Sequence, residues 1–232
     1  MNKKLSSVSF FCPAYNDEKN LPVLVPYVSE FLKEITDVYE IIIVEDGSPD
    51  KTGEVADALV REYPNVRIIH HAKNMGYGAA LRDGFVAAKY DYMMYTDGDN
   101  QYDVYEFLPY MHLLESSDVL SGYVTQKELS FRRKMQSEVY NWLIRILFFV
   151  WYLDINCAMK IYKREVLDSI SIKSSSCFID AEMILKAKKA GFTVAQFPVT
   201  HFPRTEGLAS GSKMSVIVPT IVEMLKYRFG AL

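Results

Sequence analysis

The sequence predicts an α/β protein in which a mostly parallel central sheet is flanked by helices. In the first half of the 232-residue chain, short runs of β-branched and aromatic residues alternate with longer helical patterns. This alternation is typical of βαβ units with right-handed crossovers. Half of the residues are apolar, which excludes general disorder and is enough for one domain covering residues 1–232.

The first half contains the clearest elements. The expected strands are Ser7–Phe11, Glu40–Val44, Val66–His70, Asp91–Thr96 and Asp118–Tyr123. The expected helices begin at Asn20 and then cover Lys51–Tyr63 and Gly76–Lys89. Asn20 is the expected N-cap of the first helix, because Pro22 would then stand in its first turn.

The second half has a different pattern. A long helical stretch over Ser130–Leu153 leads through a turn, Asp154–Lys160, into a short strand at Ile161–Tyr162. Asp180 is the expected N-cap of a helix over Ala181–Ala190, which Gly191 ends. The last elements are a strand, Phe192–Val199, and an amphipathic helix, Met214–Phe229.

Charge and cysteine content narrow the classes of function. The chain has 26 Lys and Arg against 29 Asp and Glu, a net charge of −3, which argues against a nucleic-acid partner. Its 3 cysteines fit no disulfide framework or zinc pattern, so a cytoplasmic location is expected. No uncharged stretch approaches the ~20 residues of a membrane span, and no signal peptide is evident.

Polar, turn-rich segments follow the first four strands. They are PAYNDE at 13–18, EDGSPD at 45–50, KNMGYG at 73–78 and DGDNQ at 97–101. Ligands of parallel sheets bind beyond the carboxyl ends of the strands. These four segments are therefore expected to converge on one site.

Asp97 and Asp99 are separated by one glycine, directly after a buried strand. Two carboxylates so placed can hold Mg²⁺ or Mn²⁺, while phosphate oxygens and water complete the shell. A solvated acidic turn is the alternative for an isolated pair. Asp46 either caps the next helix or accepts hydrogen bonds from a base or ribose. Gly76 and Gly78 would let the backbone approach a phosphate.

These four motifs, in this order and spacing, resemble the family 2 glycosyltransferases with the GT-A fold. The likeness runs from about residue 7 to 213 and is greatest to the polyprenyl-phosphate sugar synthases. It implies a Rossmann-like sheet, a nucleotide-sugar-binding half over 1–123 and an acceptor-binding half over 124–232.

The resemblance also implies roles for residues of the first half. Pro13, Tyr15 and Asp17 would line the nucleotide pocket, together with Asp46 and Gly76. Asp17 stands where the family usually has Glu, so Glu18 is an alternative. Asp97, Asp99 and Gln101 would hold the metal and the diphosphate. Gly98 departs from the D-A-D form that is frequent in the family.

Acceptor-side residues are implied as well. DINCAMK at 154–160 resembles the family's D-x-x-C-G-F-K segment, with Ala158 and Met159 as departures. Arg204 would bind phosphate from a loop that continues through Ser210 to Lys213. Arg133 and Ser137 would bind the phosphate of a polyprenyl acceptor. A further family Arg, expected near Gly122 and Tyr123, is absent.

The implied reaction is an inverting, metal-dependent transfer of a hexose from a GDP- or UDP-linked donor, with Asp99, Asp180 and Arg204 as catalytic residues. A phosphate acceptor needs no strong base. A hydroxyl acceptor of a polysaccharide does need one, and Asp180 is then the first candidate and Glu182 the second. A nucleotide-binding module without transfer activity is the remaining alternative.

Both tryptophans, Trp142 and Trp151, lie in a segment over 142–153 that has one charged residue. One interpretation is that this segment is a helix buried in the protein core. The other is that it is a helix that contacts lipid, because Trp and Tyr favour the membrane interface. The second interpretation predicts peripheral contact with the cytoplasmic face of a membrane. The sequence is also compatible with a homo-oligomer.

Overall fold

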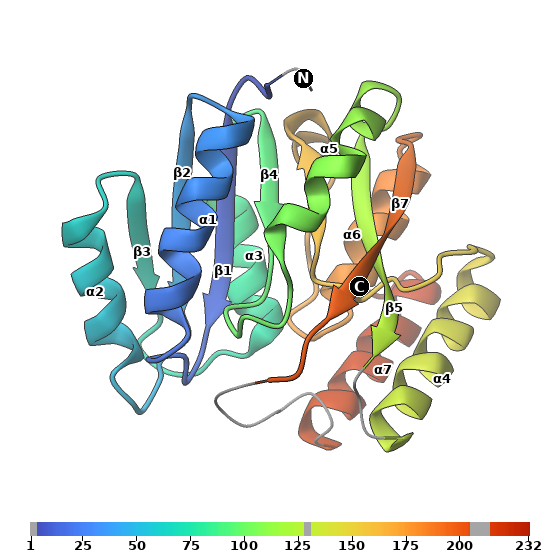
Figure 1. The fold of residues 1–232 in the computed structure, drawn as a ribbon. Coiled ribbons are helices and arrows are strands. Elements are labelled where there is room, and N and C mark those ends of the chain that lie inside the picture. The colour runs from blue at the N-terminus through green and yellow to red at the C-terminus, as the bar shows by residue number, and fades with distance from the viewer. Residues whose placement is uncertain (1–3, 128–130, 205–213) are drawn as a thin grey trace.

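The computed structural model describes residues 4–127, 131–204 and 214–232. Within that part of the chain a seven-stranded sheet has the strand order β3-β2-β1-β4-β6-β5-β7 (Figure 1). Its strands are β1 Val8–Ala14, β2 Tyr39–Glu45, β3 Val66–His70, β4 Tyr92–Tyr95, β5 Val119–Lys127, β6 Lys160–Lys163 and β7 Val194–His201. The expected sheet is confirmed.

The sheet is parallel except at β6, which is inserted antiparallel between β4 and β5. In this register Lys160 lies opposite Tyr95 on one side and Ser121 on the other. The parallel strands all end at the same edge of the sheet, the lower edge in Figure 1. The loops that follow them therefore meet there.

Helices cover both faces of the sheet. They are α1 Leu21–Ile35, α2 Thr52–Glu62, α3 Tyr77–Ala87, the 3₁₀ helix η1 Val104–Glu115, α4 Phe131–Phe148, α5 Arg164–Ser169, α6 Ile179–Lys189 and α7 Met214–Arg228. One apolar cluster packs α1, α2 and η1 against one face. A second packs α3, α5 and α6 against the other, with Ile144 of α4 and Met224 of α7. Figure 1 shows α1 in front of the sheet and α3 and α6 behind it.

Three details differ from expectation. Helix α4 ends at Phe148 and not at Leu153, because Phe149 has φ +54° and the Arg145 guanidinium donates to the backbone oxygens of Tyr152 and Leu153. Asp180 is not an N-cap: it lies inside the first turn of α6, whose N-cap is Phe178. Helices η1 and α5 were not expected.

The described helices also bear on membrane insertion. None of them combines the length and the apolar character that crossing a bilayer requires.

Candidate active site

Asp46 ties together the loops that follow β1, β2 and β3. Its backbone N–H donates to Ala14 O at 3.0 Å. Its carboxylate accepts from the backbone N–H of Met75 at 2.7 Å through Oδ1, and from that of Gly76 at 2.9 Å through Oδ2. Both oxygens therefore hold the third loop, and Gly76, with φ +92°, caps helix α3 beside them. Contact of Asp46 with a base or ribose stays a prediction.

His71 is a functional candidate that the sequence reasoning missed. It is buried, with Nδ1 2.7 Å from Asp46 Oδ1 and Nε2 3.0 Å from Asp83 Oδ2 on α3. The imidazole thus contacts the same Asp46 oxygen that accepts from the Met75 N–H, and it links that carboxylate to helix α3. Its position directly after a predicted strand was the available signal.

The first loop is organised by Asp17. This buried carboxylate accepts from the Tyr15 backbone N–H at 2.9 Å and from the Asn20 side-chain amide at 2.8 Å. Burial raises the pKa of Asp17, and the hydrogen bonds from Asn20 and Tyr15 lower it by less. The negative charge of Asp99 raises it further, so the pKa of Asp17 lies above its ordinary value. Asp17 shapes the loop, and Tyr15 beside it is 41 % exposed and open to a ligand. Pro13 lies in β1, next to this loop.

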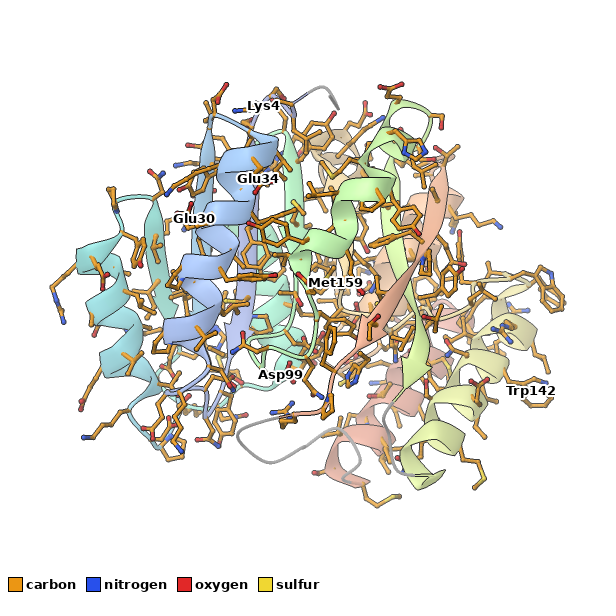
Figure 2. The ribbon with its side chains drawn as sticks, in the orientation of Figure 1. Lys4, Glu30, Glu34, Asp99, Trp142 and Met159 are labelled. Atoms are coloured by element: carbon orange, nitrogen blue, oxygen red, sulfur yellow. The ribbon has the colours of Figure 1, made fainter. Side chains whose placement is uncertain are left out.

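Asp97 and Asp99 follow β4 and lie at the edge where the loops meet. Figure 2 shows Asp99 toward the lower edge of the sheet, whereas Lys4 lies at its upper end. Oδ1 of Asp97 is buried and has no hydrogen-bond partner. Burial, followed by the charges of Asp99 and Asp180, raises the pKa of Asp97 to about 8. An oxygen in this situation is suited to a cation.

Gly98 allows the close packing of this turn. A Cβ at this position would lie 2.6 Å from Pro13 O and 3.3 Å from Asp17 Oδ2. The glycine therefore brings the Asp97–Asp99 turn against the end of β1. Its departure from the D-A-D form has a steric reason in this chain.

Asp99 joins the end of β7 to the same site. Its Oδ2 forms an ion pair with the Arg204 guanidinium, and its Oδ1 accepts from the Gln101 backbone N–H at 3.2 Å. The Gln101 side-chain amide donates to Phe202 O at 2.8 Å, and the Phe202 N–H donates to Gln101 O at 2.9 Å. Gln101 thus anchors the segment that carries Arg204, 105 residues away from Asp99.

These residues fit a divalent cation. Asp97 offers a buried oxygen without a partner, and the Asp99 carboxylate already holds a positive group. Among the described residues, no three His, Cys, Asp or Glu side chains gather around one point. Substrate phosphate oxygens, water or the Gln101 amide oxygen would therefore complete the shell, as is usual for Mg²⁺.

Asp180 is held in a buried network behind this site. Its Oδ1 accepts from the Tyr95 hydroxyl and from Lys160 Nζ, which lies 2.6 Å away. Its Oδ2 lies 3.5 Å from the Tyr77 hydroxyl. Glu182 points elsewhere: it accepts from the backbone N–H groups of Lys173 and Ser174, so its described contacts are structural.

The acceptor side is described in part. Arg133 and Ser137 both lie in α4. The Arg133 side chain falls outside the described side chains, and Ser137 is partly exposed. The loop segment through Ser210 and Lys213 also lies outside the described residues. Arg204 is described, and its guanidinium pairs with the Asp99 carboxylate.

The outer face of α4 is apolar and exposed. The residues on it are Met135, Val139, Trp142 and Ile146, at spacings of 4, 3 and 4, and each is at least 48 % exposed. Figure 2 shows Trp142 projecting away from the body of the protein. Trp151 is 83 % exposed, so neither tryptophan belongs to the core. Ile144 and Val150 are the buried members of this segment.

Helix α7 presents a second such face beside α4. Phe148 and Tyr227 bring the two helices together, with ring centroids 5.7 Å apart (Figure 1). The exposed apolar residues of this region are Met214, Val218, Ile221, Val222, Leu225 and Phe229. Exposed apolar side chains therefore lie on both of these neighbouring helices.

Comparisons with known proteins identify the family of this chain. The family model described as "Glycosyl transferase family 2" matches residues 9–171. Glycosyltransferase AglD of Haloferax volcanii is 31 % identical over 85 % of the chain, but the match spans 33 % of that protein's length. Polyprenol monophosphomannose synthase of Mycolicibacterium smegmatis is 31 % identical over 88 % of the chain and 79 % of its own length.

A solved structure shares the fold. The glucosyl-3-phosphoglycerate synthase of Mycobacterium tuberculosis, in complex with Mn²⁺, UDP and phosphoglyceric acid, superposes with a TM-score of 0.74 at 17 % identity. The match covers 98 % of this chain and 80 % of the other. The expected GT-A fold is thereby confirmed.

Proposed function

The chain belongs to glycosyltransferase family 2, and from that premise we propose that this glycosyltransferase moves a hexose from a GDP- or UDP-linked sugar to a polyprenyl phosphate, with inversion. The observation that carries the proposal is the meeting of four loops around Asp97 and Asp99, with Arg204 beside them. Residues 1–123 would bind the donor, and residues 124–232 would bind the acceptor.

Donor binding is assigned to the ordered loops. Pro13, Tyr15 and Asp17 would line the nucleotide pocket, and Asp46 and Gly76 would complete it. The exposed ring of Tyr15 and the network around Asp46 support this assignment. The mycobacterial relative is named for mannose and the structural neighbour for glucose. The experiment below therefore compares donors that carry different hexoses.

Asp97, Asp99 and Gln101 would hold Mg²⁺ or Mn²⁺, which supplies charge neutralisation for the leaving diphosphate. The structural neighbour's complex with Mn²⁺ and UDP supports this use of a metal. The protein's own part is to keep the two carboxylates at the end of β4 and to bring Arg204 to the same point. Arg204 is suited to a phosphate oxygen because its guanidinium can donate two parallel hydrogen bonds.

The transfer itself is a single displacement in this proposal. A phosphate oxygen of the acceptor forms a bond to the anomeric carbon, and the bond from that carbon to the diphosphate oxygen breaks. The electron pair leaves with the nucleoside diphosphate. A phosphate monoester is an anion near neutral pH, so no proton has to be removed. Arg133 and Ser137 of α4 would hold that phosphate.

Peripheral membrane contact is part of the proposal. Helix α4 carries both Arg133 and a row of exposed apolar side chains, so a lipid tail and its phosphate could be met by one helix. Exposed Trp and Phe side chains are well suited to the interface of a bilayer. The expected location is the cytoplasmic face of a membrane.

The central test measures release of nucleoside diphosphate from GDP- and UDP-linked hexoses with Mg²⁺ or Mn²⁺. Each reaction is run with a short polyprenyl phosphate, with the matching polyprenol, and without an acceptor. Release that depends on the phosphate supports the proposal. Equal release with the polyprenol points to a hydroxyl acceptor. If no donor releases nucleoside diphosphate, the chain is better explained as a nucleotide-binding module without transfer activity.

Membrane contact is tested by flotation with vesicles that contain anionic lipid. Trp142→Gln and Trp151→Gln together should lower the bound fraction without lowering the melting temperature, because both side chains are exposed. Val86→Gln is the matched control, since Val86 is 78 % exposed on α3, away from this surface. Unchanged flotation of the double variant would refute the contact.

A further inference from the structure

Lys160 is an unusual residue for the interior of a protein. Its side chain is fully buried at the start of β6, in the middle of the sheet. Lysine is almost never fully buried unless it is paired. We therefore expect the Lys160 ammonium group to have a role that an apolar side chain could not have.

The contacts of Lys160 use its whole hydrogen-bonding capacity. Nζ lies 2.6 Å from Asp180 Oδ1, 3.0 Å from the Tyr95 hydroxyl and 2.5 Å from Cys157 O. An ammonium group has three N–H donors, and here each has an acceptor. Lys160 is thus saturated by the protein and has no donor left for a substrate.

The sheet register explains why these groups meet. Tyr95 and Lys160 are opposite each other in the antiparallel pair β4–β6, so their side chains leave the same face of the sheet. Asp180 comes down onto that face from the first turn of α6. The Tyr95 hydroxyl donates to the same Asp180 oxygen that Lys160 holds. One carboxylate oxygen is thereby fixed from two strands.

The other carboxylate oxygen is also held inside the protein, on the side of Tyr77. Asp180 Oδ2 is 3.5 Å from the Tyr77 hydroxyl, and Asp180 lies close enough to Asp97 for the two charges to interact. Asp97, Asp99 and Asp180 together place three carboxyl groups near the point where a diphosphate must bind. Lys160 balances the charge of Asp180, as Arg204 balances that of Asp99.

We propose that Lys160 is a positioning residue that locks Asp180 as an immobile carboxylate beside Asp97, so that Asp180 does not act as a general base. This inference rests on the proposed function and deepens it. Both oxygens of the Asp180 carboxylate already accept hydrogen bonds from protein groups, and the residue is only 3 % exposed, so it is not placed to take a proton from an acceptor. The site therefore transfers only to acceptors that arrive as anions, which favours a phosphate over a hydroxyl.

The test uses Lys160→Met, Asp180→Asn and the double variant in the full chain. Lys160→Met should lower kcat with polyprenyl phosphate about 100-fold, because a misplacement of about 1 Å costs a factor of this size. The Kd for nucleoside diphosphate with Mn²⁺ should stay within about threefold, since none of the nucleotide loops contacts Lys160. Lys163→Met is the matched control on the same strand, where Lys163 pairs with Asp118 at 3.2 Å, and it should retain activity.

The double variant separates positioning from other roles. If Lys160 acts only through Asp180, the double variant loses no more activity than Asp180→Asn alone. It also leaves no unpaired buried charge, so it should fold even where Lys160→Met is unstable. The proposal would be overturned if the loss of activity in the double variant equalled the product of the two single-variant losses. A kcat for Lys160→Met within threefold of wild type would overturn it as well.

Acceptor choice gives an independent readout. Wild-type transfer to the polyprenol at a rate comparable to that with the phosphate would also overturn the inference. Absence of any transfer by the wild type, in contrast, would be a failure of the proposed function itself. The two failures are therefore distinguishable.

Discussion

Replacing Arg204 with Gln should strengthen the binding of Mn²⁺ in the absence of nucleotide. The Asp99 carboxylate has two roles in this proposal: its Oδ2 pairs with the Arg204 guanidinium, and the carboxylate is also a proposed metal ligand. A cation must displace or outcompete the guanidinium. Removing the positive group frees the oxygen and leaves the site more negative.

The magnitude follows from the burial of the pair. The Asp99 side chain is 9 % exposed and that of Arg204 is 26 % exposed, so the pair is only partly screened by water. A hydrogen bond to a charged group contributes about 1.5–3 kcal/mol. Since about 1.4 kcal/mol is a tenfold change, the Kd for Mn²⁺ should fall about 10- to 100-fold.

The assay is calorimetric titration of Mn²⁺ into the nucleotide-free protein. Arg67→Gln is the matched control, because Arg67 also pairs with a buried carboxylate, Glu40, at 2.8 Å. That variant should leave the Kd for Mn²⁺ unchanged. Transfer activity of Arg204→Gln should fall, because the guanidinium is lost from the diphosphate. A Kd for Mn²⁺ that is unchanged or higher in Arg204→Gln would refute the reasoning.

Three further predictions concern the loops and the sheet. Gly47→Ala should lower the free energy of unfolding by about 1–3 kcal/mol in urea melts, because Gly47 has φ +62° and a Cβ would lie 2.3 Å from Lys73 C. His71→Ala should weaken nucleoside diphosphate binding about tenfold in a titration, because Asp46 loses a side-chain partner at 2.7 Å, and unchanged affinity would count against that role. Burial raises the pKa of Glu40, but hydrogen bonds from Arg67 and Ser9 outweigh it and hold that pKa below its ordinary value. The stability this carboxylate contributes is therefore present above its unfolded pKa and lost as the pH falls through the folded pKa, so Glu40→Gln should flatten the acid limb of a plot of melting temperature against pH.

Much of the fold was predictable because its signals are local. Runs such as Glu40–Val44 and helix-forming stretches such as Lys51–Tyr63 follow from patterns a few residues long. The strand of β6 was also expected, but its antiparallel insertion between β4 and β5 was not. Strand order depends on which surfaces pack together, and no short pattern records that.

The end of α4 shows a limit of the same kind. Apolar residues continue through Leu153, so periodicity alone extends the helix to that point. The structure ends it at Phe148, because the Arg145 guanidinium satisfies two backbone oxygens of the following segment. A side chain that reaches beyond the helix decided its length.

The sequence by itself determined the family, the parallel sheet and the set of loops that meet beyond the strand ends. It did so because polar turn residues follow each of the first four strands and the Asp97–Asp99 pair follows the fourth. Only the tertiary structure decided the partners of those residues: Arg204 with Asp99, His71 with Asp46, and Lys160 with Asp180. It also decided that Trp142 and Trp151 face outward. Partners far apart in the chain are selected by packing, and packing is a property of the whole fold.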